Sequence, residues 1–292
     1  MKKFLILIII MLAQSIFVNP CFAIKIGLQN GVERTYVGST KSAQVLNANT
    51  NKLLYTLSGM KGYEFRAYKN SISIKVQGKY FNLDSDNIVI KPESGGYISA
   101  KGKWYRGFFV LCNKGGSLVV INNVNIEDYI KGVVPSEMPS KWSYEAHKAQ
   151  AIAARSYALA NLGKRASRGF DLKDTPEDQA YGGASAEAAQ TNQAVDETRG
   201  IVLIYGMKII PAYYSASAGG QTSSSSDVWT KNLPYLQSVP SYDDNVKKNG
   251  HGVGMSQHGA NNLAKSGYNA YQILQYFYKG VQFARINQSF YK

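Results

Sequence analysis

The spacing of apolar residues changes near residue 126 of this 292-residue chain, and this change limits the possible folds more than any other feature. Before it, residues 71–76 (SISIKV) alternate polar and apolar, and short apolar runs such as 118–121 (LVVI) are separated by Gly or Asn pairs. This pattern is typical of short antiparallel strands. After it, residues 143–163 hold seven alanines and end at a glycine, as a closely packed helix would. We therefore predict an α+β fold with an antiparallel β region at 24–122, as a sandwich or half-barrel, and a mixed helix and strand domain at 123–292.

Within the second domain the same signals predict three further helices and one strand pair. Glycines follow each expected helix, and Gly206 lies between the two expected strands. The expected helices cover residues 143–163, 185–198 with Ser185 as the cap, 255–266 and 270–279, and the expected strands cover 201–205 and 208–216.

The N-terminus has the order of a secretory leader. Lys2 and Lys3 precede an apolar run over residues 4–18, and Ala23 supplies a small residue at the cut position. The alternative is an uncleaved membrane anchor, but the unbroken run is short and polar residues interrupt it. We expect export with removal of residues 1–23, which places the protein in the periplasm, the cell wall or on an outer-membrane-facing surface.

The charge of the chain indicates acidic partners. Lys and Arg number 33 against 19 Asp and Glu, and 21 Tyr, 11 Phe and 3 Trp make the chain rich in aromatic rings. An exported protein does not meet DNA or RNA, so we expect no nucleic-acid partner. An acidic wall polymer or an anionic membrane surface suits an exported basic protein better. Two cysteines exclude a disulfide-rich scaffold and a four-cysteine zinc site.

Glu137 is the strongest candidate for acid–base chemistry. It lies between Pro135 and Pro139 among apolar neighbours, so its backbone is stiff and its carboxyl should lose water. Desolvation raises the pKa of a carboxyl, as a general acid near neutral pH requires. The alternative is a glutamate that caps the next helix.

Arg155 lies on an apolar face of the alanine-rich helix, because Ala151, Ile152, Ala158 and Leu159 are its helical neighbours. A guanidinium buried there needs a carboxylate, a carbonyl or a substrate group as partner. The alternative is an arginine whose charged end reaches solvent.

Two glycine-rich segments could line a sugar site. Residues 213–222 (YYSASAGGQT) lead from a strand into a loop with hydroxyl groups, and residues 250–260 hold two of the three histidines just before a helix. Glycines let a ligand approach the backbone closely, and a helix start offers free N–H groups. An ordinary hairpin turn explains the first segment equally well.

Taken together, these segments resemble the stage II sporulation protein D / amidase enhancer family, also written SpoIID/LytB. The resemblance covers residues 103–280, and its five motifs occur in the family order. They are residues 125–139 (NIEDYIKGVVPSEMP), 148–158 (KAQAIAARSYA), 178–183 (DQAYGG), 215–222 (SASAGGQT) and 250–257 (GHGVGMSQ).

The resemblance implies an exported peptidoglycan protein whose second domain forms a glycan-binding groove. One branch of the family consists of lytic transglycosylases that cleave MurNAc–GlcNAc strands to 1,6-anhydro products and partner an amidase; its catalytic glutamate maps onto Glu137. Another branch is named for stimulating a wall amidase. The expected partners are peptidoglycan glycan strands and a cell-wall amidase. The expected substrate-binding residues are Arg155, Gln179, Tyr181, Tyr214, Ser215, Ser217, Gln221, His251, Ser256 and Gln257.

One departure from the family concerns the length of a connection. Only thirteen residues separate Leu236 from Gly250, where the family usually has several more strands. The connection indicates either a lost subdomain or a more open groove. It supports the rival interpretation, a non-catalytic wall-binding module that stimulates an amidase.

A second departure concerns metal binding. Some members carry Cys and His zinc ligands before the DQ-Tyr motif, but residues 170–177 (FDLKDTPE) contain neither, and His251 and His258 lack a third ligand. We predict no cofactor and no stoichiometric zinc. Metal analysis of the purified protein checks this, and about one zinc per chain would contradict it.

Overall fold

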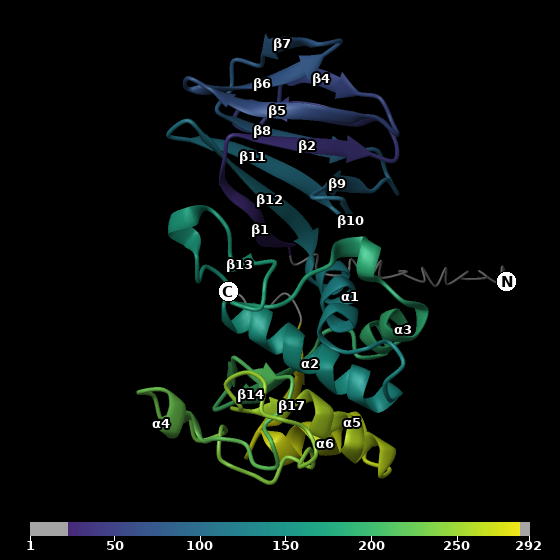
Figure 1. Cartoon of the computed structure of the whole chain (residues 1–292), viewed down its shortest axis with the longest axis vertical. Helices are drawn as coiled ribbons and strands as arrows, with labels where there is room; N and C mark the ends of the chain where they lie inside the picture. The colour runs from purple at the N-terminus through teal and green to yellow at the C-terminus, as the bar shows by residue number, and fades with distance from the viewer. Residues whose placement is uncertain (1–22, 287–292) are drawn as a thin grey trace, which may run out of the picture.

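The computed structural model describes residues 23–286, and it has the α+β architecture that the sequence predicts. A β sandwich occupies one end of the elongated molecule, and the helices with the smaller sheets occupy the other (Figure 1). The predicted leader falls outside the described residues except for Ala23, which begins β1. No described helix has the length and apolar character needed to cross a membrane.

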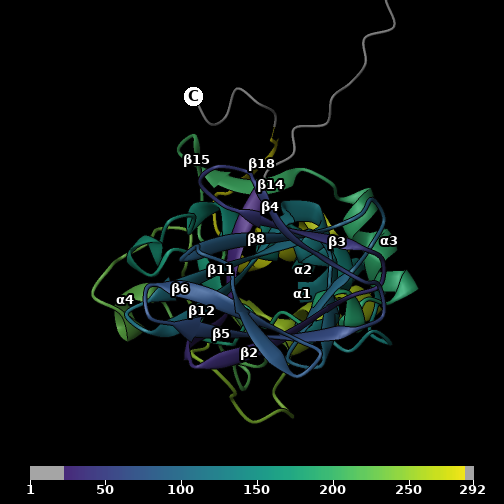
Figure 2. The same ribbon diagram turned by 90° about the horizontal axis from the view of Figure 1, so that it is seen from above.

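The β region consists of two sheets that pack face to face, and the view from above shows their strands crossing (Figure 2). Alternating residues such as Val45, Phe65 and Ile90 are fully buried between them. The first sheet has the order β13-β1-β12-β11-β8-β3-β4, with β1 (Ala23–Val32), β3 (Ala43–Asn47), β4 (Leu53–Leu57), β8 (Asn87–Pro92), β11 (Phe108–Lys114), β12 (Ser117–Asn125) and β13 (Leu172–Lys173). The second has the order β10-β9-β2-β5-β6-β7, with β2 (Arg34–Ser39), β5 (Gly62–Tyr68), β6 (Ser71–Val76), β7 (Lys79–Asn82), β9 (Ile98–Ala100) and β10 (Lys103–Tyr105).

The second part is built around helix α2. Its helical segments are α1 (Ile126–Glu137), α2 (Tyr144–Ala160), η1 (Ala166–Arg168), η2 (Gly183–Ala186), α3 (Ala189–Glu197), α4 (Ser225–Val228), α5 (Gln257–Lys265) and α6 (Ala270–Phe277). Its strands are β14 (Ile201–Tyr205), β15 (Lys208–Ile209), β16 (Tyr214–Ser215), β17 (Met255–Ser256) and β18 (Gln282–Arg285). The alanines of α2 let α1, α3, α5, α6 and β14 all pack against it.

Helix α1 was not among the helices that the sequence predicts. Gly132, Val133, Val134 and Pro135 are all poor helix formers, and Pro135 lies inside the helix. Burial of Val133 and Val134 in the core overrides these local preferences. The side chain of Asn125 caps the first turn by accepting the Glu127 N–H at 2.8 Å.

Two other local expectations were wrong. Ser185 does not cap α3; it lies in η2, and its hydroxyl accepts the Trp104 N–H at 2.8 Å. The strand expected over 208–216 ends at Ile209, and residues 214–215 instead pair in parallel with β17. This second pairing brings the two glycine-rich segments together.

Arg155 and Glu127 form a buried ion pair that joins α2 to α1. The guanidinium is fully buried and donates two hydrogen bonds to the carboxylate, at 3.0 Å and 2.7 Å. It also donates to the carbonyl oxygen of Ile201 at 3.1 Å, and Glu127 accepts the Gly200 N–H at 3.0 Å. The pair therefore ties α1, α2 and the start of β14 into one unit.

We predict that Arg155→Ala destabilises the protein strongly. Loss of one partner from a buried ion pair leaves an uncompensated charge and costs about 3–5 kcal/mol. Urea unfolding measures the change, and Lys208→Ala, at an exposed position, should stay within about 0.5 kcal/mol of wild type. Equal stability of Arg155→Ala and wild type would contradict this role.

Candidate functional site

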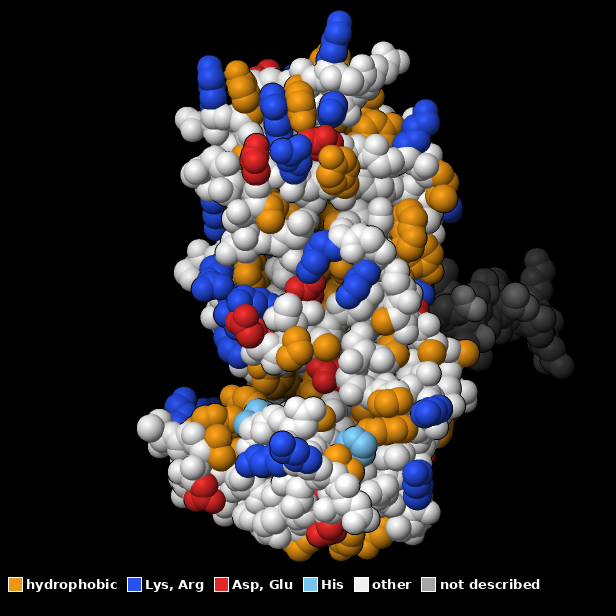
Figure 3. Space-filling model, viewed as in Figure 1, with side chains coloured by type: hydrophobic (Ala, Val, Ile, Leu, Met, Phe, Trp, Pro, Cys, Tyr) orange, Lys and Arg blue, Asp and Glu red, His pale blue; other side chains and the backbone are white. Residues whose placement is uncertain are grey.

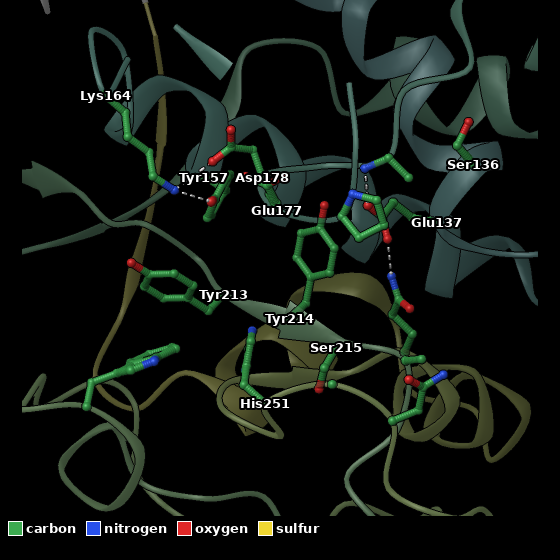
Figure 4. A pocket seen from close by; sticks show the side chains of 17 residues that line it. Ser136, Glu137, Tyr157, Lys164, Glu177, Asp178, Tyr213, Tyr214, Ser215 and His251 are labelled. Atoms are coloured by element: carbon green, nitrogen blue, oxygen red, sulfur yellow. Dashed lines mark hydrogen bonds and ion pairs between the residues drawn. The ribbon is translucent and has the colours of Figure 1, made fainter. Parts of the chain in front are cut away.

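A cleft of about 510 Å³ lies between the end of α1, the segment before Ala180, β16 and the start of α5 (Figures 3 and 4). It brings together five of the residues that the sequence singles out. They are Glu137, Tyr214, Ser215, His251 and Gln257.

Glu137 is the last residue of α1, and its carboxylate receives hydrogen bonds from three neutral donors. The Ala180 N–H donates to Oε1 at 2.7 Å, and the Gln257 amide donates to Oε2 at 3.2 Å (Figure 4). The Tyr214 hydroxyl is the third donor. Burial raises the pKa of Glu137, and these three hydrogen bonds only partly offset the rise. The raised pKa that the sequence predicts is therefore present, although the carboxyl is held at a helix end rather than by a stiff loop.

A hydrogen bond from Gln179, which lies outside the cleft, orients the Tyr214 hydroxyl. The Gln179 amide nitrogen donates to the Tyr214 hydroxyl oxygen at 2.9 Å, while its amide oxygen accepts the Tyr129 hydroxyl at 3.1 Å. Because the Tyr214 oxygen already accepts a bond, its own proton is directed to another acceptor, the Glu137 carboxylate. Burial raises the pKa of Tyr214 well above its usual value, so the phenol stays a donor. Gln179 itself is fully buried and does not line the cleft.

Four aromatic rings form one wall of the cleft, and of these only His251 was among the expected substrate-binding residues. The rings belong to Tyr157, Tyr213, Trp229 and His251. Tyr213 and Trp229 have ring centroids 4.6 Å apart, and Trp229 lies 5.2 Å from His251. Tyr157 packs edge-on against Tyr213 at 5.6 Å. Aromatic faces with polar edges are suited to a ligand that has apolar and polar sides, such as a sugar ring. The adjacent tyrosines at 213 and 214 were the available signal for this wall.

His251 is held as a neutral ring. Its Nδ1 accepts the Val253 N–H at 3.0 Å, so the ring proton lies on Nε2. Burial, together with the nearby charge of Lys248, lowers the pKa of His251.

A network of charges lines another part of the cleft, and sequence reasoning missed it as well. Lys164 donates to Asp178 at 2.7 Å and to the Tyr157 hydroxyl at 3.1 Å. Arg165 donates to the other oxygen of Asp178 at 2.6 Å. These bonds lower the pKa of Asp178 in spite of its burial, which opposes ionisation. Asp178 is therefore a fixed anion rather than a proton donor.

Three of the expected ligands support the loops instead of lining the cleft. Ser217 donates to the Lys247 carbonyl at 2.6 Å, and Gln221 donates to the Ser238 hydroxyl at 2.7 Å. Ser256 caps α5 by accepting the Gly259 N–H at 3.1 Å. Ser215 does line the cleft, and among the described residues its buried hydroxyl has no hydrogen-bond partner.

Arg155 and Tyr181 also lie away from the cleft. Arg155 has no exposed surface and its bonds go to Glu127 and backbone carbonyls, so the expected contact with substrate is corrected to a structural role. Tyr181 is buried against Tyr105 and Tyr129, and its hydroxyl donates to Asn122 at 2.9 Å. Within residues 23–286 no group of three or more His, Cys, Asp or Glu side chains could hold a metal ion.

Asp243 holds the loops of the site together, and no sequence pattern pointed to this residue. One oxygen accepts the Ala218 N–H at 2.7 Å and the Ser256 hydroxyl at 2.6 Å. The other accepts the Gly220 N–H at 2.8 Å and the Ser241 hydroxyl. One carboxylate thus joins the Gly-Gly loop to the residue before Gln257.

The fold and the cleft define an α+β protein with a desolvated acidic side chain beside aromatic rings, and comparison with known proteins places it in a family. Residues 114–205 match the family model described as Stage II sporulation protein. The Amidase enhancer of Bacillus subtilis is 37% identical over 209 residues, covering 69% of this chain and 28% of that protein. Stage II sporulation protein D of Bacillus subtilis is 27% identical over 257 residues, covering 56% and 75%. An uncharacterized protein of Brachyspira hyodysenteriae is 33% identical over 198 residues, covering 68% and 50%.

Residues 114–205 therefore carry the domain of the SpoIID family, which three of the five motifs indicated, and the chain is similar to SpoIID and amidase enhancer proteins beyond this domain. The match covers half of the Brachyspira protein and about a quarter of the amidase enhancer. The family supports a function associated with the cell wall.

We predict that Asp243→Asn destabilises the protein at neutral pH. An asparagine amide would turn donor hydrogens toward the N–H and hydroxyl donors that the carboxylate accepts, and an unsatisfied buried group costs about 1–3 kcal/mol. The pKa of Asp243 is lowered in the folded protein by these four hydrogen bonds, which outweigh the opposing effect of burial. The contribution of the Asp243 carboxylate to the free energy of unfolding is therefore present above the unfolded pKa of about 3.9, and it is lost as pH falls through the pKa of the folded protein.

Urea unfolding at several pH values measures this difference. The difference in free energy of unfolding between wild type and Asp243→Asn should be largest near pH 7 and should become smaller below about pH 4. Asp227→Asn, at an exposed carboxylate, is the matched control and should show no such gap. A gap that stays constant with pH would contradict the assignment.

Proposed function

We propose that this protein is an extracytoplasmic lytic transglycosylase that cleaves peptidoglycan glycan strands between N-acetylmuramic acid and N-acetylglucosamine. The observation that carries the proposal is the environment of Glu137. Its carboxyl is desolvated, its pKa is raised, its partners are neutral, and it faces a cleft with aromatic rings. These are the conditions for a carboxyl that keeps a proton near neutral pH and delivers it to a sugar oxygen.

In the first step, protonated Glu137 donates its proton to the glycosidic oxygen as the bond from that oxygen to muramyl C1 breaks. The positive charge that develops on the sugar ring is spread over C1 and the ring oxygen. The rings of Tyr213 and Trp229 would hold the sugars on either side of this bond by stacking.

In the second step, the Glu137 carboxylate takes the proton from the muramyl C6 hydroxyl, and O6 bonds to C1. The product is a 1,6-anhydro ring, and the glutamate is again protonated. Tyr214, Gln257 and the Ala180 N–H would stabilise the carboxylate between the two steps. One carboxyl acts first as acid and then as base, so this scheme needs no second carboxylate, unlike the common hydrolases.

A second candidate function is stimulation of a wall amidase without glycan cleavage. The similarity to the Bacillus subtilis Amidase enhancer favours it, at 37% identity. The short connection from Leu236 to Gly250 favours it too, because the resemblance implies several more strands there in the family. In that function the cleft would bind glycan, and a cell-wall amidase would be the partner.

We predict that Glu137→Gln abolishes the release of 1,6-anhydro products. The amide keeps the shape of the side chain but cannot deliver a proton, and general acid–base catalysis contributes about 10²–10⁴-fold. Mass spectrometry of digested glycan strands that lack stem peptides measures the rate. Glu177→Gln is the matched control, because Glu177 lines the same cleft but is exposed and pairs with Lys173.

Two outcomes would contradict the transglycosylase. The first is release at the wild-type rate by Glu137→Gln. The second is the absence of anhydro products with wild type, and an amidase assay with and without the protein would then test the enhancer function.

A further inference from the structure

The outer face of the six-stranded sheet carries a patch of cations and aromatic rings far from the cleft in the fold. In the sheet register, Arg34 is opposite Arg66, Tyr36 is opposite Glu64, and Lys75 lies between Glu64 and Tyr80, so all six side chains share one face. We call these six residues the β-face patch. Over this end of the molecule Lys and Arg side chains alternate with apolar ones (Figure 3).

Glu64 lies at the centre of the β-face patch and holds the side chains around it in place. It is nearly buried, and its carboxylate accepts the Tyr80 hydroxyl at 2.5 Å and the Tyr36 hydroxyl at 3.1 Å. Arg34 and Lys75 lie 3.7 Å and 3.8 Å from it. The bond from Tyr80 is the main cause of the lowered pKa of Glu64, so the carboxylate stays charged. The β-face patch therefore contains one anion and three cations, of which two are paired with Glu64, and it keeps a positive excess.

Arg66 has hydrogen-bonding capacity that the described residues do not use. Its guanidinium lies over the Tyr80 ring, 3.5 Å from the ring centroid, and this stacking fixes its position. Its Nε is buried and has no hydrogen-bond partner in the described part of the chain. The guanidinium is therefore positioned by stacking on Tyr80 rather than by a hydrogen bond from its Nε.

The patch continues into a shallow depression floored by backbone. Gly38 and Gly62 are opposite each other in the sheet, and Trp104, Ser99 and Lys61 lie around them in a space of about 190 Å³. A Cβ added at Gly62 would meet no atom within 4 Å, and its φ is not in the left-handed region. Neither packing nor backbone conformation therefore requires a glycine there, and what the glycine provides is an open surface beside an indole ring.

We propose that the β-face patch and the depression beside Trp104 form a second, non-catalytic binding surface for an acidic polysaccharide, the glycan strand of the wall. Sugar rings stack on exposed aromatic faces, and carboxylates pair with guanidinium and ammonium groups. The surface extends across several strands, so it suits a polymer better than a single sugar. It would hold the polymer while the cleft acts on it. The identity of the polymer rests on the proposed function, but the surface does not depend on cleavage.

The first test fills the depression. Gly62→Val places a β-branched side chain in a strand, where it should not lower stability. In a Glu137→Gln background, which prevents digestion, cosedimentation with purified peptidoglycan sacculi should fall at least about fivefold, equal to about 1 kcal/mol. With Glu137 intact, Gly62→Val should cleave short soluble glycan strands at the wild-type rate. A failure of retention and a failure of cleavage are thus separate results.

The second test removes charge from the β-face patch. Arg34→Gln/Lys75→Gln should lower cosedimentation by a similar factor, while Lys208→Gln/Lys265→Gln removes the same charge at exposed positions outside the patch and should not. The thermal midpoints of all variants show whether each is folded.

Three results would overturn the proposal. One is cosedimentation with sacculi at the wild-type level by folded Gly62→Val or folded Arg34→Gln/Lys75→Gln. Another is an equal loss of cosedimentation in the control Lys208→Gln/Lys265→Gln. The third is equally strong, patch-dependent binding to anionic phosphatidylglycerol vesicles, which would assign the surface to a membrane.

Discussion

The buried pair of Glu127 and Arg155 is the interaction on which the position of the site depends. Glu127 lies in the first turn of α1, and Glu137 is the last residue of the same helix. Two bonds from one guanidinium, together with the Gly200 N–H, fix α1 relative to α2 and β14. A charge in the core is tolerated only when it is paired in good geometry, so the alternatives to this arrangement are costly. The pair thereby places a helix whose own sequence is poor at forming one.

The buried carboxylates of this protein differ in their partners, and the difference separates structural groups from the candidate acid. Glu127 has a guanidinium, and Asp178 has a lysine and an arginine. Asp243 has no cation but accepts four hydrogen bonds, which are sufficient to lower its pKa. Glu137 has three neutral donors, and desolvation outweighs them. A carboxyl in this position holds its proton more tightly than Asp178 and Asp243, whose pKa values are lowered, and is the one suited to proton transfer.

The short connection between Leu236 and Gly250 supplies the residue that assembles the loops. Asp243 belongs to it and binds the Gly-Gly loop on one side and the cap of α5 on the other. The parallel pairing of Tyr214 and Ser215 with Met255 and Ser256 then places Tyr214 and Gln257 on the same carboxyl group. The order of these loops thus depends on one anion as well as on the apolar core that contains Leu236, Val239 and Val253.

The sequence alone determined the α+β fold, the alanine-rich helix and the resemblance to SpoIID proteins, and it singled out Glu137 as the candidate acid. Local sequence patterns indicate those features: the alternation of polar and apolar residues, the small residues at helical spacing, and the ordered motifs. Sequence patterns could not show that α1 is a helix, because its residues disfavour one and only burial stabilises it. They also could not separate Arg155, Gln179 and Tyr181 from the residues that line the cleft. A motif residue can serve packing or ligand binding equally well. Its role depends on which other residues the fold places in contact with it. The aromatic wall and Asp243 come from segments distant in the sequence, so only the tertiary structure placed them at the site.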